Sequence, residues 1–431
     1  MVTVSSAILK EVLKIIDENN DRISDAGFEG ANIVLYTKDK DFFLNGGGII
    51  KKAVREFKKR IELRPDPEVT MDEEEADRVI RDLIPKESEV DNIIFDPQRS
   101  NVIIETEKPG VAIGKQGQVL RDIKEKTMWV PVIKRKPAIK CKLIEDIRGV
   151  LYQNNDFRKK FLDHTGHRVY DGWIRGKKSE WVRLTFLGAG RQVGRSCLLL
   201  QTPESRILLD CGIDPAYGIG NPSAYPYLES PDFKVDELDA VIVSHAHLDH
   251  SGLIPLLSKY GYKGPIYCTE PTRDVMSLLQ LDMVKIMRGE GKDPIYTSEE
   301  VKETVKQTIT LGYEEVTDIT PDVRITFYNS GHIIGGAMVH LHIGNGLHNL
   351  MYTGDIKFNK TALLDPAATS FPRLETAVLE ATYGGKDSIQ PSREESERDI
   401  QQIIQRTIKG GGKVLVPVLG VGRAQEVMLV I

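Results

Sequence analysis

The chain has 431 residues, of which 40% are hydrophobic and 28% charged, and its formal net charge is −5. This composition is typical of globular domains and excludes a disordered or fibrous protein, and no apolar run approaches the ~20 residues that cross a bilayer. Four scattered cysteines without a C-x-x-C pair favour a reducing, cytoplasmic environment over a disulfide framework or a thiolate metal site.

The N-terminal 67 residues predict the order helix, strand, strand, helix. Apolar residues at helical spacing indicate a helix at Ala7–Ile16, and two short strands are predicted at Asn32–Tyr36 and Asp41–Leu44. Gly46–Gly48 then leads into Ile49–Leu63, a predicted basic amphipathic helix that stops before a proline.

Residues 68–146 look like a variant of this first segment. They predict a helix, two strands, a second helix entered through glycines and a closing strand. The predicted ranges are Asp72–Leu83, Val90–Phe95, Asn101–Glu105, Ile113–Lys126 and Trp129–Ile133. Two α+β units of similar length indicate an internal duplication.

A basic stretch covers the end of this second segment. Between Glu107 and Lys142, ten basic side chains face three acidic ones, a net charge of +7 on a short part of an acidic chain. Such a stretch is either a solvated surface or a nucleic-acid contact. Residues 147–180 are helical and then polar, and we expect them to form a linker.

From residue 181 short β-rich runs are broken by glycine turns and then alternate with helices, a pattern typical of an α/β domain. The predicted strands are Arg183–Leu187, Cys197–Thr202, Arg206–Asp210 and Ala240–Ser244, and the predicted helices are Met276–Arg288 and Ser298–Thr310. Another unit begins near residue 385, with a helix at Glu394–Ile408, a buried strand at Lys413–Pro417 and an apolar helix at Arg423–Ile431.

The strongest chemical signal is the run Ser244-His245-Ala246-His247-Leu248-Asp249-His250 at the end of a hydrophobic strand. Imidazole nitrogen and carboxylate oxygen are ligands that suit zinc. Three of the nine histidines fall within six residues, and such a cluster is costly to bury without a metal. The other histidines, His164, His167, His340, His342 and His348, are predicted to be structural or exposed.

The pattern His-x-His-x-Asp-His resembles the metallo-β-lactamase superfamily, and its other motifs follow in order. Leu208-Leu209-Asp210-Cys211-Gly212 is similar to the first motif, whose aspartate ends a strand. Ser330-Gly331-His332-Ile333-Ile334-Gly335-Gly336 is similar to the third, and Tyr352-Thr353-Gly354-Asp355 is similar to the fourth. The resemblance implies an αββα sandwich over 181–384. It also implies a metal site formed by His245, His247, Asp249, His250, His332 and Asp355.

Two further runs resemble the nucleic-acid-cleaving β-CASP branch of this superfamily. Leu379-Glu380-Ala381-Thr382-Tyr383-Gly384 is similar to its first motif, and the run from Val414 through Arg423 to Glu426 is similar to the start of its inserted domain. A surface acid at Glu380 and a helix-terminal cation at Arg423 are the alternative interpretations. The resemblance implies that residues 385–431 begin a β-CASP insertion.

The G-x-x-G sequence Gly114-Lys115-Gln116-Gly117 follows two strands and opens a basic helix, so residues 68–146 resemble a KH domain. In KH domains this loop clamps single-stranded nucleic acid. We expect the four loop residues, Lys124 and Arg423 to contact RNA. Residues 1–67 have only Gly46-Gly47-Gly48 at the corresponding place and look like a degenerate KH domain.

This arrangement resembles one family, the archaeal homologues of the cleavage and polyadenylation specificity factor nuclease. The resemblance implies a zinc-dependent endoribonuclease that cleaves single-stranded RNA in 3′-end formation and transcription termination, with 5′→3′ exonuclease action in some relatives. It also implies dimerisation of the full-length protein and contact with the transcription machinery. The alternatives are a β-CASP DNA nuclease, a small-molecule hydrolase of the superfamily and a non-catalytic RNA-binding scaffold.

The resemblance also implies roles for the site residues. His245, His247 and His332 would hold one zinc, Asp249 and His250 a second, and Asp355 would bridge them, as in two-metal sites that activate water. Asp249 would orient or accept a proton of that water, Asp210 would brace the site without binding metal, and Glu380 would orient a proton-donating histidine.

That proton-donating histidine has no counterpart in this sequence. The family has two more functional histidines after the inserted domain, whereas no histidine follows His348 here. We therefore expect this sequence to be a fragment of a longer nuclease, with a weak second zinc site and less than full activity.

Overall fold

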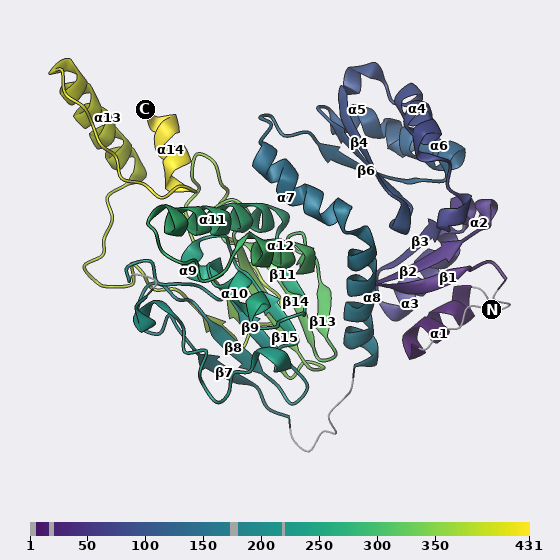
Figure 1. Ribbon diagram of the computed structural model, residues 1–431, viewed down its shortest axis with the longest axis horizontal. Helices are drawn as coiled ribbons and strands as arrows, with labels where there is room; N and C mark the ends of the chain where they lie inside the picture. The colour runs from purple at the N-terminus through teal and green to yellow at the C-terminus, as the bar shows by residue number, and fades with distance from the viewer. Residues whose placement is uncertain (1–5, 17–20, 173–179, 218–219) are drawn as a thin grey trace. The chain divides into compact units, whose positions relative to one another are not determined.

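The computed structural model describes residues 6–16, 21–172, 180–217 and 220–431. The chain divides into two units, Met1–Ile174 with Ile319–Pro321, and Arg175–Asp318 with Asp322–Ile431. Figure 1 traces it from the purple N-terminal helices to the yellow C-terminal ones. No helix in the described ranges is long and apolar enough to cross a membrane.

The first repeat of the N-terminal unit is a three-stranded sheet packed against helices. Its elements are α1 (Ala7–Ile16), β1 (Asp25–Glu29), β2 (Asn32–Thr37), α2 (Lys40–Asn45), α3 (Gly47–Phe57) and β3 (Ile61–Pro65). The central strand β2 pairs antiparallel with β1 and parallel with β3. Leu9 and Val12 of α1 and Ile50 of α3 pack with Ile33 and Leu35 of β2.

Two predictions for this repeat are wrong. Asp41–Leu44 is helical, because Asp39 caps the helix by accepting a hydrogen bond from the Phe42 amide and because the adjacent Phe42 and Phe43 are both buried, which an alternating strand does not allow. The predicted helix Ile49–Leu63 ends at Phe57, and the residues from Ile61 form β3. β1 was not predicted.

The second repeat has the same order of elements and the same strand pairing as the first. Its elements are α4 (Glu73–Leu83), β4 (Val90–Asp96), β5 (Asn101–Thr106), α5 (Pro109–Ile113), α6 (Gln118–Thr127) and β6 (Val130–Arg135). The central strand β5 pairs antiparallel with β4 and parallel with β6. The predicted duplication is therefore confirmed at the level of the fold.

The segment predicted as a linker is helical as far as Asp171. It contains the end of α7 (Lys142–Gln153) and all of α8 (Asn155–Asp171). The Phe28 amide of β1 donates a 2.9 Å hydrogen bond to Asp163, and Gly166 lies so close to Phe28 that an added Cβ would meet its Cβ at 2.1 Å. The predicted helical start of 147–180 is thus confirmed, but this helix packs on the first repeat and is not a free connection, and the Lys177-Lys178 pair lies outside the described residues.

The second unit contains two sheets. The six-stranded sheet has the order β12-β11-β10-β9-β8-β7, with β9 to β12 parallel, and the five-stranded sheet has the order β13-β14-β15-β16-β17. The strands are β7 (Arg183–Phe186), β8 (Leu198–Gln201), β9 (Arg206–Leu209), β10 (Ala240–Ile242), β11 (Ile266–Cys268), β12 (Thr308–Thr310), β13 (Thr317–Thr320), β14 (Val323–Asn329), β15 (Ala337–Ile343), β16 (His348–Tyr352) and β17 (Thr376–Val378).

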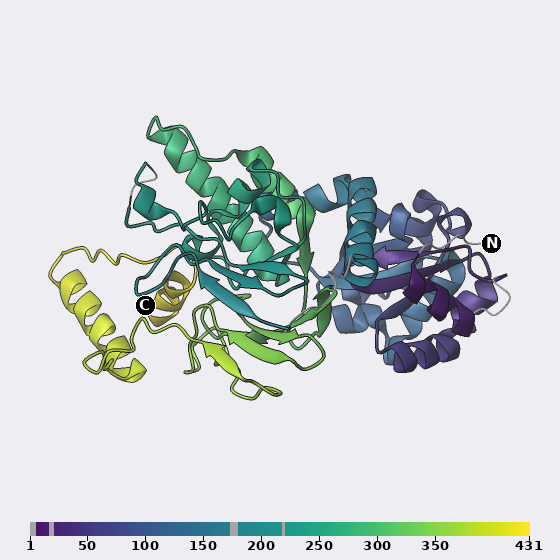
Figure 2. The same ribbon diagram turned by 90° about the horizontal axis from the view of Figure 1, so that it is seen from below.

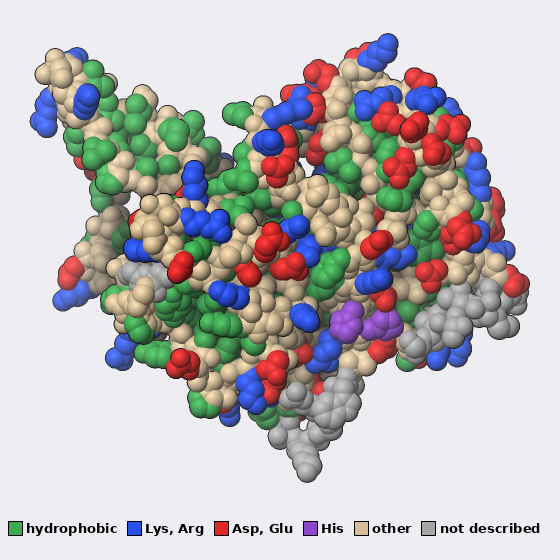
Figure 3. Space-filling model, viewed as in Figure 1, with side chains coloured by type: hydrophobic (Ala, Val, Ile, Leu, Met, Phe, Trp, Pro, Cys, Tyr) green, Lys and Arg blue, Asp and Glu red, His purple; other side chains and the backbone are tan. Residues whose placement is uncertain are grey.

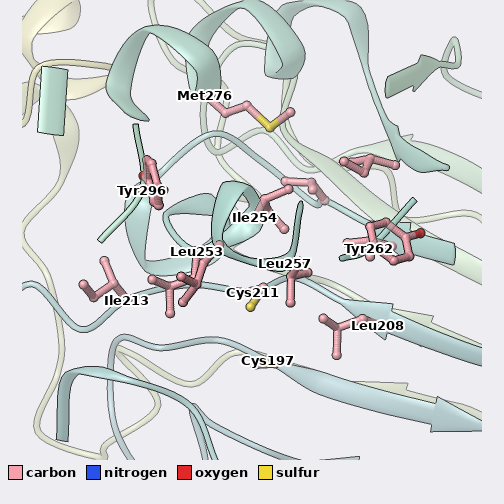
Figure 4. Close-up of a cluster of buried hydrophobic side chains, with 14 of the residues drawn as sticks. Cys197, Leu208, Cys211, Ile213, Leu253, Ile254, Leu257, Tyr262, Met276 and Tyr296 are labelled. Atoms are coloured by element: carbon pink, nitrogen blue, oxygen red, sulfur yellow. The ribbon is translucent and has the colours of Figure 1, made fainter. Parts of the chain in front are cut away.

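Helices lie over the six-stranded sheet. They are α9 (Leu248–Ser251), α10 (Ile254–Lys259), α11 (Glu270–Gly289) and α12 (Ser298–Gln307). Figure 2 shows these helices, the strands β7–β9 and the light-green strands of the second sheet as successive layers. Between the helices and the first sheet lies a buried cluster that includes Leu208, Cys211, Leu253, Met276 and Tyr296 (Figure 4).

The last part of the unit contains α13 (Arg393–Lys409) and α14 (Arg423–Val430). The prediction of a buried strand at Lys413–Pro417 is wrong, because no described strand pairs with this segment and Leu415 is 92% exposed. Figure 3 shows hydrophobic side chains gathered over α13 and α14, and Ile403, Met428 and Leu429 are among the exposed ones.

Candidate metal centre

The predicted ligands converge because they follow strands whose ends lie close together. β9 and β10 are parallel neighbours, so Asp210 and the run His245–His250, which follow these strands directly, lie at the same sheet edge. His332 lies in the connection from β14 to β15, and Asp355 follows β16. All six predicted ligands therefore meet at one place.

One group consists of His245, His247, His332 and Asp355, with ligand atoms within 4.8 Å of one another. Nδ1 of His247 lies 3.2 Å from Nε2 of His245 and 3.2 Å from Nε2 of His332, and Oδ2 of Asp355 lies 3.4 Å from Nε2 of His332. Ligands at ~2.0–2.1 Å in a tetrahedron around zinc are about 3.3 Å apart. The donor atoms and their spacing therefore fit a tetrahedral zinc.

The second group consists of His245, Asp249 and His250. Nε2 of His250 lies 3.8 Å from Oδ2 of Asp249 and 3.3 Å from Oδ1 of Asp355. Asp355 thus presents Oδ1 to the second group and Oδ2 to the first. This arrangement suits a carboxylate between two cations.

Asp210 lies behind the ligands and is completely buried. Its Oδ1 accepts a hydrogen bond from the Ser244 amide, and its Oδ2 accepts hydrogen bonds from the Ser244 hydroxyl, the Tyr352 hydroxyl and Nδ1 of His250, all at 2.7 Å. The residue has a φ of +58°, a conformation that aspartate tolerates better than most side chains.

These hydrogen bonds determine where two ligand histidines carry their protons. A carboxylate only accepts, so Nδ1 of His250 donates to Asp210, and Nε2 is the nitrogen that faces the site and is left to bind a metal. The Ser244 hydroxyl donates to Asp210, so it accepts from Nδ1 of His245 at 3.1 Å. Asp210 therefore orients His250 directly and His245 through Ser244.

The electrostatics of the cluster favour a bound cation. Burial lowers the pKa of His245 well below its ordinary value and the pKa of His332 to about 4, and neighbouring imidazoles act in the same direction. Burial raises the pKa of Asp355, but the hydrogen bond from His250 and the surrounding imidazoles lower it more, to about 2. Without a metal, unprotonated imidazole nitrogens of His245, His247 and His332 face one another and the ionised carboxylate of Asp355.

His250 differs from the other histidines of the cluster. Burial opposes its charge, but hydrogen bonds to Asp210 and Asp355 outweigh burial and raise its pKa well above the ordinary value. In the metal-free protein, His250 therefore carries the proton that a cation displaces.

Two glycines of the predicted motifs allow close packing around the ligands. A Cβ on Gly212 would lie 1.7 Å from the carbonyl oxygen of Asp249, and a Cβ on Gly354, whose φ is +52°, would lie 2.6 Å from the Ser244 hydroxyl. Any side chain at either position would displace the ligand loop.

Glu380 and Arg423 lie outside the two ligand groups. The Glu380 amide donates to the Thr353 hydroxyl at 3.3 Å, two residues from Asp355, and the Glu380 carboxylate accepts from the Thr382 amide at 2.8 Å. Arg423 is the exposed first residue of α14. The structure thus positions Glu380 near the ligand strand but shows no partner histidine for it among the described residues.

The remaining histidines are away from the cluster. His340 contacts the Arg373 carbonyl at 3.1 Å, His342 contacts Asn349 at 2.8 Å and His348 contacts Thr376 at 2.9 Å. His164 is exposed on α8, where Nδ1 of His167 lies 2.8 Å from Asp171. Their predicted structural or exposed character is confirmed.

The G-x-x-G loop separates α5 from α6, so the predicted helix from Ile113 is interrupted. Gly114 and Gly117 both have a φ of +73°, and Gln116 has a φ of +51°. The Lys115 and Gln116 side chains are exposed at the tip. This is the shape in which a backbone can approach a phosphate closely.

Lys124 lies elsewhere, near the end of α6. Its ammonium is 5.9 Å from the centre of the Phe43 ring, and partial burial lowers its pKa. In the first repeat, Gly46 joins α2 to α3 with a φ of −70°, and neither Gly47 nor Gly48 has a positive φ. The first repeat therefore lacks the clamp geometry of the second.

Sequence reasoning assigned no role to three groups that support the ligands. They are the Ser244 and Tyr352 hydroxyls, which bind Asp210, and the Val421 carbonyl, which lies 3.3 Å from Nε2 of His247. Ser244 and Tyr352 are parts of the recognised motifs, but a backbone carbonyl has no sequence signal.

The fold and the site define the class of protein. Residues 199–380 match the family described as Metallo-beta-lactamase superfamily domain, residues 3–70 match the KH domain of transcription termination factor FttA, and residues 75–128 match the KH domain family. This is a metal-binding hydrolase domain of the metallo-β-lactamase type, preceded by two KH domains.

Curated relatives specify the family. The chain is 48% identical to transcription termination factor FttA of Methanothermobacter thermautotrophicus over 430 residues, which is 99% of this chain and 67% of that protein. The corresponding factor of Methanocaldococcus jannaschii is 48% identical over 98% of this chain and 66% of its own length. The chain belongs to the archaeal FttA family and spans about two thirds of the length of these relatives.

Proposed function

We propose that the protein is a zinc-dependent ribonuclease that cleaves single-stranded RNA during transcription termination and RNA 3′-end formation. The observation that carries this proposal is the convergence of six histidine and aspartate ligands in a chain that also has a G-x-x-G loop. The relatives are named transcription termination factors, which supports the process.

Two zinc ions are the proposed cofactors. His245, His247, His332 and Asp355 would hold one, and Asp249 and His250, with Asp355 shared, would hold the other. Bound zinc polarises a phosphoryl oxygen and lowers the pKa of its bound water to about 7, which provides a nucleophile at neutral pH.

The residues of the chain then have separate tasks. Asp210 holds His250 and, through Ser244, His245 in the tautomers that expose Nε2. The Asp249 carboxylate, 3.8 Å from Nε2 of His250, is proposed to accept a proton from the attacking water. Glu380 is proposed to orient a proton donor to the leaving oxygen.

RNA binding is proposed at the G-x-x-G loop. Gly114 and Gly117 let the backbone approach a phosphate, and exposed Lys115 and Gln116 supply charge and hydrogen bonds. Arg423 is proposed as a further phosphate contact. The partial burial of Lys124 against Phe43 favours a structural role for Lys124 over the RNA contact that the sequence suggested.

Partners and location follow from the same proposal. A termination factor acts on nascent RNA, so the transcription machinery is its proposed partner, and a homodimer is proposed for the full-length protein. The four cysteines are free, which fits action in the cytoplasm. Endonucleolytic cleavage, with 5′→3′ trimming as a second activity, is the proposed reaction.

The test is incubation of the chain with labelled single-stranded RNA and matched DNA, with zinc or with a chelator. We expect zinc-dependent cleavage of RNA that the variant His247→Ala loses by at least about 100-fold. Cleavage of DNA alone would indicate a DNA nuclease. Binding of RNA and zinc without cleavage, by the full-length protein as well as by this chain, would indicate a scaffold.

A further inference from the structure

The loop Gly420–Gly422, which precedes α14, contacts the first ligand group. The Val421 carbonyl oxygen lies 3.3 Å from Nε2 of His247, across 174 residues of sequence. No other described contact holds the outer nitrogen of this ring.

The chemistry of the carbonyl assigns the proton of His247. A carbonyl oxygen only accepts, so Nε2 of His247 carries a hydrogen and donates it to Val421. Nδ1 is then the unprotonated nitrogen. This is the atom that lies 3.2 Å from Nε2 of His245 and 3.2 Å from Nε2 of His332.

The backbone of the loop is built to keep this carbonyl in place. Gly422 has φ +100° and ψ −93°, a conformation that a residue with a side chain does not adopt without strain. The Gln425 side chain accepts from the Gly422 amide at 2.7 Å and donates to the Gly420 carbonyl at 3.0 Å. Two hydrogen bonds therefore hold the loop on either side of Val421.

Packing attaches the loop to the metal-binding domain. The Val421 side chain packs against the buried cluster between α9–α12 and the six-stranded sheet. A Cβ on Gly422 would lie 2.9 Å from Cγ2 of Ile333, the residue after the ligand His332. The loop thus fits between two ligand-bearing segments.

We propose that the Gly420–Gly422 loop is a positioning element of the metal centre, in which the Val421 carbonyl fixes the tautomer and ring orientation of His247. The Val421 carbonyl orients the His247 ring, just as Asp210 orients the ring of His250 directly and the ring of His245 through Ser244. Groups that orient a ligand imidazole in this way typically change metal affinity by 10–100-fold. The inference rests on the metal centre of the proposed function and deepens it.

The proposal has a consequence for Arg423. The loop contacts the proposed ligand His247 through Val421 and continues directly into α14. A metal that orders His247 therefore also stabilises the docked loop, and the docked loop stabilises metal binding. Arg423, two residues after Val421, then takes its position when the centre is loaded. The loop therefore links the metal centre to the segment proposed to contact RNA.

The experiment compares two glycine variants of the full chain. Gly422→Ala forces the strained backbone to move, whereas Gly411→Ala is the matched control, because Gly411 also has a positive φ, +72°, but lies outside the loop and has nothing within 4 Å of its Cβ position. Zinc affinity is measured by competition with a chelator, and cobalt(II) absorption reports the ligand geometry. We expect about 10–100-fold weaker zinc binding and an altered cobalt spectrum for Gly422→Ala only.

Circular dichroism and thermal unfolding in chelator show whether Gly422→Ala folds. If it does not fold, Gln425→Ala replaces it. This variant removes both side-chain hydrogen bonds of the loop, and we expect it to weaken zinc binding as well. Wild-type affinity and an unchanged cobalt spectrum in the folded variant overturn the inference. Failure of the unmodified chain to bind zinc overturns the proposed function instead.

Discussion

Asp210 accepts a 2.7 Å hydrogen bond from Nδ1 of His250, forty residues further along the chain. The same carboxylate oxygen also binds the Ser244 and Tyr352 hydroxyls. One buried side chain that binds no metal in our proposal therefore controls how two ligand imidazoles face the site.

Replacing Asp210 with asparagine should weaken zinc binding by about 10–100-fold, because the neutral amide no longer holds Nδ1–H of His250 with a full charge. Competition with a chelator measures the change. Asp322→Asn is the control, since Asp322 is an acid of the same unit that accepts hydrogen bonds from the Thr202 and Ser205 hydroxyls. Equal losses in both variants would show a general effect on the fold.

The two ligand groups should fill in sequence. The first group has four protein ligands, whereas Asp249 and His250 depend on sharing Asp355 and on the nearby His245. We expect one zinc to survive dialysis against a moderate chelator and the second to be lost. Asp355→Ala should weaken both steps and Asp249→Ala mainly the second, as metal analysis of the dialysed proteins will show. Two zincs of equal affinity would contradict this prediction.

The metal-free chain should lose stability on acidification because of His332. Its folded pKa of about 4 lies below the ordinary value of 6.5, so between these values the unfolded chain binds a proton that the folded chain does not. The lost stability at pH 5 is at most about 2 kcal/mol. In chelator, the Tm of His332→Gln relative to the unmodified chain should therefore be several °C higher at pH 5 than at pH 7.

A metal-loaded sample is the control for this pH effect. Zinc held by His332 occupies the nitrogen that the proton would take, so the variant should then be the less stable protein at both pH values. If the Tm difference in chelator does not change between pH 7 and pH 5, the depressed pKa of His332 is wrong.

Charge reversal at the G-x-x-G loop should weaken RNA binding. Lys115→Glu places a negative charge at the exposed loop tip and should reduce affinity for single-stranded RNA by about tenfold, with a shallower dependence on salt. Lys51→Glu is the matched control, because Lys51 is exposed on α3 of the first repeat, which lacks the loop geometry. Fluorescence anisotropy at two salt concentrations distinguishes the variants.

The sequence by itself determined the local parts of this protein. The His-x-His-x-Asp-His run, the motifs around Asp210, His332 and Asp355, and the G-x-x-G loop were recognised because they are short and depend on residue type and spacing. Long amphipathic helices such as α4 and α13 were predicted within a residue or two, since their apolar period is set by their own side chains.

Only the tertiary structure decided the features that depend on a partner far away in the sequence. Asp41–Leu44 is helical because Phe42 and Phe43 are both buried. The helix predicted at the start of 147–180 packs through α8 on β1, a contact that its own sequence does not show. The tautomer of His247 depends on the Val421 carbonyl, 174 residues later. Burial and backbone hydrogen bonds across such separations exist only once the chain has folded, so no local pattern of residue types encodes them.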